Sequence, residues 1–354
     1  MSEPLMRIVD RNTMYLHYDK VYTMRGKKPS LKTLIVLSDI KVQELGKYVE
    51  RKIGLHKQFN VKVTPLSESL YNVFIQRTMG IEQVQAEVFI DTGYNGVWII
   101  ITEAESYLVR RVVEALCKKL YPLISMFYLN YSEMLFLTKT MEKSSEGQVD
   151  LTYLTLKRLK ENDNGTEVLW ATRVDKEIKR LQFDGYSVKV DHLEFKLRDK
   201  VGALLRAQLS RKGLCELKYG SFSLFYENVV FNAIEYGLKQ KKFYSQRETS
   251  IEDGNIQVYP LKIDYDFSIH QEQMSQFVKK IVSGYSCSVI HSGNPYFAAD
   301  LCDYGDGSSF GVAILGNSVT LTPIAKANAP AVWKLTGEIQ EIFGDGQVRD
   351  ITVA

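Results

Sequence analysis

The chain of 354 residues has a net charge of +3, with 45% hydrophobic and 25% charged residues. This composition is typical of a folded globular protein with room for two or three hydrophobic cores, and it excludes an intrinsically disordered chain. The sequence has no apolar run of 18 residues and no apolar segment near its first residues, so we expect neither a membrane span nor a secretion signal.

The cysteines point to a reducing compartment. Cys117, Cys215, Cys287 and Cys302 are dispersed, with neither CxxC nor zinc-ligand spacing. Disulfides persist mainly in oxidising compartments, so we expect buried, reduced thiols and a cytoplasmic protein.

Strand and helix patterns alternate in the first part of the chain. Apolar runs predict strands at Leu31–Leu37 and Phe59–Val63, and helically spaced apolar residues predict a helix over residues 41–54. Residues 84–90 and 97–102 form a predicted β-hairpin, because the intervening DTGYNG supplies the glycines and asparagine that such turns need. The other elements predicted here are an amphipathic helix at Tyr107–Leu120, a strand over residues 124–131 and a helix over residues 132–143.

The middle of the chain begins after the polar segment KSSEGQ and is basic. Residues 151–250 hold 19 Lys and Arg against 13 Asp and Glu. A helix is predicted at Val174–Gln182, followed by two strands or one long bent strand over residues 183–197. We expect a helix at Val201–Leu209 and a strand at Leu214–Tyr219. A longer helix is predicted at Ser223–Leu238.

The last part of the chain is acidic, with 6 Lys and Arg against 12 Asp and Glu in residues 251–354. Its predicted elements are a strand with a central Pro260, which should lie at a sheet edge or at a bulge, and a helix at Gln271–Val282. Three strands joined by glycine-containing turns and a helix over 329–343 are predicted to follow. The fold class is therefore predicted to be mixed α+β, with β-hairpin or meander units joined to helices. The predicted domains are residues 1–146, 147–250 and 251–354.

One stretch of the middle domain carries a possible metal site. Asp184 precedes Glu194 and Lys196, and we expect them on neighbouring strands. Two carboxylates placed side by side can bind Mg²⁺ by oxygen, and a lysine two residues further on shares the second carboxylate's strand face. This spacing resembles the PD-(D/E)xK nucleases. The resemblance implies a Mg²⁺-dependent nuclease with Asp184 and Glu194 as metal ligands and Lys196 as a catalytic residue.

The same residues have a simpler interpretation as charged residues on solvated strand faces. Glu-x-Lys triplets recur at Glu177–Lys179 and Glu216–Lys218, and Phe183 stands where the nuclease motif has proline.

Basic residues interleaved with aromatic ones form a candidate phosphate-contact surface in the middle domain. Its members are Arg206, Arg211, Lys212, Lys239, Lys241, Lys242 and Arg247. The alternative is that they are solvated residues at helix ends, where Lys and Arg also complement the helix dipole.

The remaining catalytic patterns are absent from the sequence, since it has no HxxxH pair, no GxGxxG and no GxxxxGK[ST]. We therefore predict a non-enzymatic binding or scaffold subunit of a cytosolic multi-protein assembly. Its expected partners are other protein subunits, with nucleic acid as a further candidate through the basic middle domain, and no membrane. No cofactor is expected, except Mg²⁺ if the alternative function, the nuclease, holds.

Overall fold

The computed structural model describes residues 7–23, 29–52, 54–145, 147–160, 163–170, 174–184, 186–200, 202–249, 258–293 and 296–351. Helices and antiparallel sheets both contribute, so the mixed α+β prediction is confirmed. The chain forms two compact units, each made of two stretches: unit 1 is Met1–Thr152 with Leu193–Gly237, and unit 2 is Tyr153–His192 with Leu238–Ala354. The division into three domains stays a prediction, and its boundaries near residues 146 and 250 lie outside the described residues.

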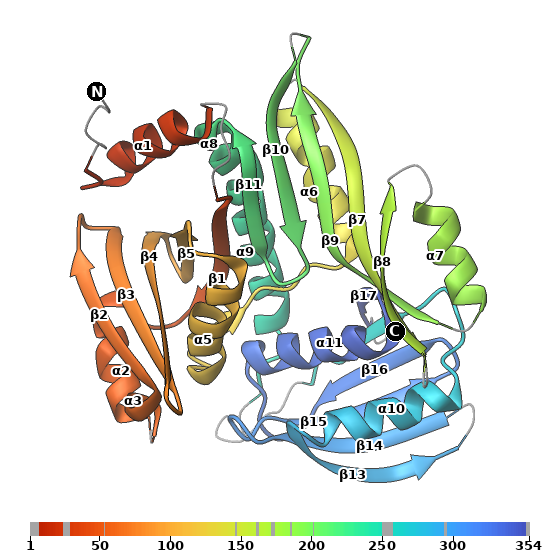
Figure 1. The fold of residues 1–354 in the computed structure, drawn as a ribbon. Coiled ribbons are helices and arrows are strands. Elements are labelled where there is room, and N and C mark those ends of the chain that lie inside the picture. Colours follow the sequence, from red (N-terminus) through yellow and green to blue (C-terminus); the bar gives the residue numbers. More distant parts are fainter. Residues whose placement is uncertain are drawn as a thin grey trace. The chain divides into compact units, whose positions relative to one another are not determined.

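Unit 1 is organised around an antiparallel sheet with the strand order β2-β3-β4-β5-β1-β11-β10-β9, and β6 pairs with β1 (Figure 1). The central strand β1 pairs with β5 on one side and β11 on the other, and all of its residues are buried. The strands are β1 (Leu31–Ser38), β2 (Phe59–Pro65), β3 (Leu70–Met79), β4 (Glu82–Tyr94), β5 (Val97–Thr102), β6 (Ile124–Met126), β9 (Ser187–Arg198), β10 (Ala203–Ser210) and β11 (Leu214–Gly220).

Helices pack on both faces of this sheet. On one face, Val73, Ile90 and Ile100 share a hydrophobic core with residues of η1-α2 and of the α4-η2-α5 helix. Asp91 follows Ile90 and therefore points to the opposite face, where it contacts Arg11 of α1 and Tyr226 of η4. The helices of this unit are α1 (Arg11–Thr23), η1 (Val42–Glu44), α2 (Leu45–Arg51), α3 (Leu55–Gln58), α4 (Ser106–Leu108), η2 (Val109–Glu114), α5 (Ala115–Lys119), α6 (Tyr131–Ser145), α8 (Phe222–Phe225) and η4 (Tyr226–Val230), which α9 (Phe231–Ser245) continues.

Unit 2 contains a second antiparallel sheet with the strand order β13-β14-β15-β16-β12-β17. Helices α10 and α11 cover one face, where the ring of Phe277 lies 5.6 Å from that of Phe343 and 6.0 Å from that of Phe297. The elements of this part are β12 (Leu261–Asp264), α10 (Gln271–Ile281), β13 (Tyr285–Ser292), β14 (Tyr296–Asp303), β15 (Ser309–Leu315), β16 (Ser318–Pro323), α11 (Ala329–Phe343) and β17 (Gln347–Asp350). The unit also includes α7 (Val174–Phe183) and most of the hairpin β7 (Gln148–Lys160) and β8 (Asp163–Trp170).

Most predicted elements are confirmed, but β12, which begins after Pro260, pairs with both β16 and β17 and is therefore not an edge strand. The helix predicted at Val201–Leu209 is also wrong. Residues Ala203–Ser210 form β10, which pairs with β11. The buried residues of β10 stand at every second position, as in a strand: Leu205, Ala207 and Leu209 are all fully buried. The helical spacing of Leu204, Leu205 and Leu209, on which the helix prediction rested, does not decide the structure here.

The cysteine prediction is confirmed in part. All four cysteines are free thiols, and Cys117 and Cys215 are buried, whereas Cys287 is half-buried and Cys302 is exposed. Among the described residues, none of the helices combines the length and apolarity that a membrane span requires.

Candidate functional site

Glu194 lies in the middle of a buried ion-pair cluster in unit 1. Its side chain has no solvent exposure. Arg206 Nε donates to Glu194 Oε1 at 2.7 Å, and Lys218 Nζ donates to Oε2 at 2.6 Å. The three side chains come from β9, β10 and β11, neighbouring strands of one sheet. Because a basic group already engages each carboxylate oxygen, the contacts of Glu194 are those of a structural ion pair, which leaves neither oxygen open for a metal ion.

The other predicted metal-site residues have different surroundings. Asp184 is in a turn after α7, so its predicted place on a strand is wrong. It belongs to unit 2, and its Oδ2 lies 3.9 Å from Arg180 Nη1. Lys196 is half-buried on β9, on the same face as Glu194. Among the side chains that the structure describes, no group of three or more His, Cys, Asp or Glu is placed to hold a metal ion. The nuclease site stays a prediction.

The basic residues of the predicted phosphate-contact surface differ in exposure. Lys239 and Lys242 are exposed, and Lys212 and Lys241 are partly exposed, whereas Arg211 is buried. The last two residues of the predicted surface form ion pairs within the protein. Arg206 pairs with Glu194, and Arg247, whose side chain is 1% exposed, pairs with Asp350. The buried members cannot contact phosphate in this conformation, and a nucleic-acid role for the others stays a prediction.

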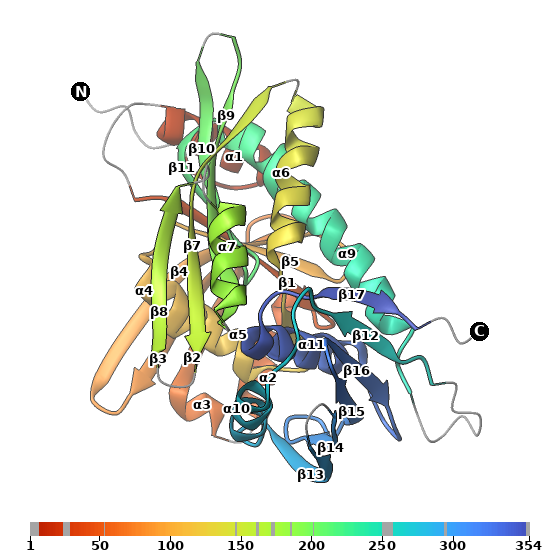
Figure 2. The ribbon, with the colours of Figure 1, turned by 90° about the vertical axis from the view of Figure 1, so that its right-hand side faces the viewer.

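A different feature, β13, is the candidate site that the structure favours. It is the first strand of the sheet in unit 2, with β14 on its only paired side (Figure 2). Tyr304 N donates to Gly284 O at 3.1 Å, so Gly284 faces the β14 side. Backbone groups alternate in an antiparallel pair, which directs the N–H and C=O of Tyr285, Cys287 and Val289 away from β14. β13 therefore presents a row of backbone donors and acceptors at the sheet edge.

The side chains of β13 do nothing to protect this edge. Its sequence, YSCSVIHS, has no charged residue and no proline. Val289 is 45% and Ile290 66% exposed, and the pairing register shifts between Val289 and His291. Tyr296 of β14, which is 40% exposed, adds its ring 5.1 Å from that of His291. Natural proteins block exposed edges with charged residues, prolines, very short strands or β-bulges. Of these, β13 has only the register shift between Val289 and His291.

Three other strands at the ends of the two sheets have an open side, and each carries charged residues. Strand β2 contains Lys62 and Pro65, and β8, the second strand of the β7–β8 hairpin, contains Asp163 and Glu167. Strand β17 has only 4 residues, and Arg349 Nε forms an ion pair with Asp264 at 2.5 Å. In the described part of the chain, β13 is the terminal strand that contains no Asp, Glu, Lys, Arg or Pro.

The start of β13 is fixed to the core of unit 2 by a buried charge cluster. Asp303, paired with Tyr285 across the strands, accepts from Lys334 Nζ at 2.9 Å, and this ammonium lies 4.8 Å from the centre of the Tyr285 ring. Nearby on α11, burial raises the pKa of Glu338, an effect that Lys334 partly offsets. These contacts therefore anchor one end of β13, while the exposed apolar residues lie toward its other end.

No known protein-family model matches this chain, and no curated protein sequence matches it significantly.

Proposed function

We propose that the protein is a non-enzymatic binding subunit of a cytosolic multi-protein assembly, and that it binds a partner protein by strand addition to β13. The partner's extended segment pairs with the outward N–H and C=O groups of Tyr285, Cys287 and Val289. The observation that carries the proposal is an eight-residue terminal strand without any charged residue or proline.

The side chains indicate the chemistry of the partner segment. Main-chain hydrogen bonds supply affinity in strand addition, and side chains at alternate positions supply specificity. Val289, Ile290 and Tyr296 are exposed apolar residues around the second half of β13. We therefore expect an extended, uncharged partner segment with apolar residues where it meets them.

The test removes one outward donor and leaves the β13–β14 ladder intact. Val289→Pro deletes the N–H that points to the open edge, and Val289→Thr keeps it in a strand-forming residue. A second blocking variant, Ile290→Lys, places an edge lysine beside the same site. Full-length proteins carrying each change are used to purify partners from the source cells.

The expected result is a partner recovered with wild type and Val289→Thr, and lost with Val289→Pro and Ile290→Lys. A synthetic peptide from that partner should slow hydrogen exchange over residues 285–292. Recovery of the same partner by both blocking variants, or protection confined to another segment, would contradict strand addition at β13.

A further inference from the structure

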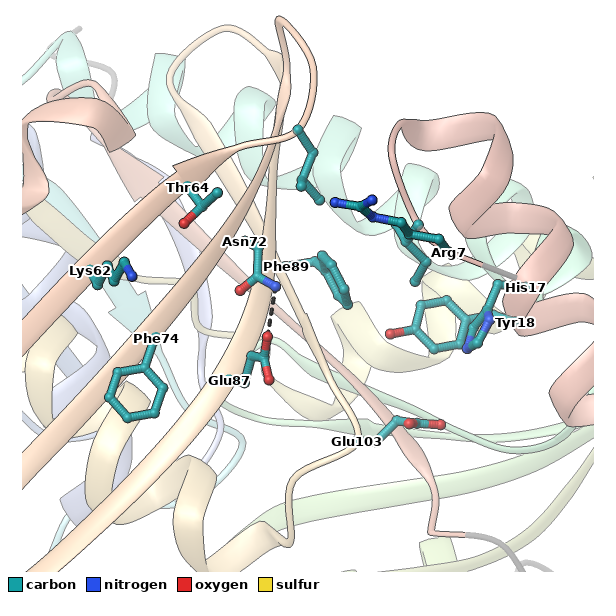
Figure 3. A pocket seen from close by; sticks show the side chains of 12 residues that line it. Arg7, His17, Tyr18, Lys62, Thr64, Asn72, Phe74, Glu87, Phe89 and Glu103 are labelled. Carbon is teal, nitrogen blue, oxygen red and sulfur yellow. Dashed lines mark hydrogen bonds between the residues drawn. The ribbon is translucent and has the colours of Figure 1, made fainter. Parts of the chain in front are cut away.

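A pocket of about 820 Å³ lies in unit 1, on the sheet face opposite the main hydrophobic core (Figure 3). Two rows of side chains cross β2, β3 and β4 there. Paired residues form one row of Thr64, Asn72 and Phe89 and a second row of Lys62, Phe74 and Glu87. The residues between them, Val63, Val73 and Val88, pack in or against the core on the other face, so period-2 alternation turns all six toward the pocket.

Helix α1 and the segment before it form the opposite wall. Tyr18 is 2% exposed and points its hydroxyl into the pocket toward Phe89, while Arg7 extends over the pocket from the same side (Figure 3). The helix is held firmly, because Arg11 pairs with Asp91, and Asp19 accepts from Ser221 Oγ at 2.9 Å. These contacts fix α1, which carries Tyr18, whereas Arg7 is exposed on the segment before the helix.

Several polar groups of this pocket have no bonding partner among the described residues. Neither the Arg7 guanidinium, the Lys62 ammonium nor the Tyr18 hydroxyl takes part in a hydrogen bond or ion pair there. Burial raises the pKa of Tyr18, with Glu103 and Glu87 adding to the effect, so the hydroxyl stays protonated and can donate. The hydroxyl is open to the pocket, where an acceptor of a ligand can take the place of water.

The open acceptors lie on the other side of Phe89. Asn72 Nδ2 donates to Glu87 Oε1 at 2.7 Å, which leaves Asn72 Oδ1 and Glu87 Oε2 as neighbouring acceptors. Figure 3 shows the Phe89 ring between this Asn72–Glu87 pair and the Arg7 and Tyr18 side. A ligand that covers Phe89 therefore meets acceptors at one edge and a cation with a hydroxyl donor at the other.

We propose that this pocket binds a nucleotide whose base carries an exocyclic amino group. The base stacks on Phe89, and its amino group donates to Glu87 and Asn72. The phosphate contacts Arg7, since guanidinium groups bind phosphate through paired hydrogen bonds. Phe74 and Lys62, in the adjacent row, offer the same combination of ring and cation to a second nucleotide if the ligand is a strand.

The experiment measures binding to the full-length protein by calorimetry, with AMP, CMP and UMP as free nucleotides and ten-residue oligo-A and oligo-C as single strands. Phe89→Leu keeps apolar volume but removes the aromatic face, and Phe183→Leu, at a 91% exposed site in unit 2, is the matched control. Arg7→Gln and adenosine test the phosphate contact. Circular dichroism melting checks that each variant is folded.

We expect AMP and CMP to bind more tightly than UMP, and Phe89→Leu to weaken AMP binding roughly tenfold, the scale of losing one stacking contact. Arg7→Gln should weaken AMP but not adenosine, and Phe183→Leu should change neither. Binding of the oligonucleotides alone, weakened by Phe89→Leu, would assign the pocket to a single strand. Equal binding of UMP and AMP, insensitivity to Phe89→Leu, or binding of no nucleotide would overturn the proposal.

Discussion

The buried carboxylate of Asp91 fixes α1 to the sheet, and Asp91→Asn tests how much stability it contributes. Asp91 accepts from Arg11 Nη2 at 2.5 Å, from Tyr226 Oη at 2.9 Å and from the Gly93 N–H at 2.9 Å. Its side chain has no exposure, and that of Arg11 is 31% exposed. The substitution keeps the shape of the side chain but removes the charge, and it places an NH₂ group where one donor pointed.

The size of the effect follows from these contacts. Hydrogen bonds to a charged group contribute about 1.5–3 kcal/mol each, and breaking a fully buried ion pair costs about 3–5 kcal/mol. Arg11 is partly accessible and can recover some hydration, while Tyr226 remains a protonated donor because burial raises its pKa. We therefore expect Asp91→Asn to lower the free energy of unfolding by about 2–3 kcal/mol.

The assay is equilibrium urea unfolding, with hydrogen exchange reporting on residues 11–23. Glu82→Gln is the control, because Glu82 also pairs with an arginine, Arg111, but both side chains are over two-fifths exposed, so stability should stay near wild type. In an Arg11→Met variant the buried Asp91 carboxylate no longer has a positively charged partner. Adding Asp91→Asn to that variant should then leave its free energy of unfolding unchanged or raise it. An equal loss in both backgrounds would refute the ion-pair explanation.

Three further predictions concern other groups. Burial raises the pKa of Glu338, so the carboxyl group keeps its proton to higher pH in the native state than in the unfolded state. The free energy of unfolding should therefore fall as pH rises from the pKa of the unfolded state toward that of the native state. Glu338→Gln should flatten this part of a pH series of urea midpoints. Alkylation at pH 8 should modify the exposed Cys302 first, since burial raises the pKa of Cys117 and Cys215 to about 12, and peptide mass spectrometry checks the order. Glu194→Gln should lower the urea midpoint, because it removes the charge that Arg206 and Lys218 engage. Any Mg²⁺-dependent cleavage of labelled DNA or RNA should be the same in this variant as in wild type. Cleavage that disappears in a folded variant would restore the nuclease hypothesis.

Elements with strong local signals could be predicted from the sequence. The hairpin of β4 and β5 has glycines in its turn, with Gly96 at φ 74°, and α11 begins with an Asn328 cap and ends at Gly344, where φ is 95°. The β10 prediction failed because its leucines fit both helix and strand periods. Helix α1 was missed because tertiary contacts stabilise it, among them the Asp19 bond to Ser221.

The pocket had a sequence signal that local patterns could not interpret. Lys62-Val-Thr64, Asn72-Val-Phe74 and Glu87-Val-Phe89 each place a valine between two outward residues, which predicts strands with one solvent-facing side. What makes these segments a site is that they are adjacent and in register, and pairing between strands cannot be read from alternation within each. The unprotected character of β13 likewise depends on which strand ends the sheet.

The contrast between Glu194 and the pocket shows what a motif leaves undecided. Glu194 and Lys196 have the spacing of a metal site, yet Arg206 and Lys218 from the neighbouring strands engage both oxygens of that carboxylate. The Tyr18 hydroxyl belongs to no motif, but the described residues around it leave it without a partner. An ionisable or polar group can bind a ligand only if its neighbours in the fold leave it uncommitted, and those neighbours come from distant parts of the chain. For this protein the strongest candidates for binding are therefore the groups that sheet pairing leaves open.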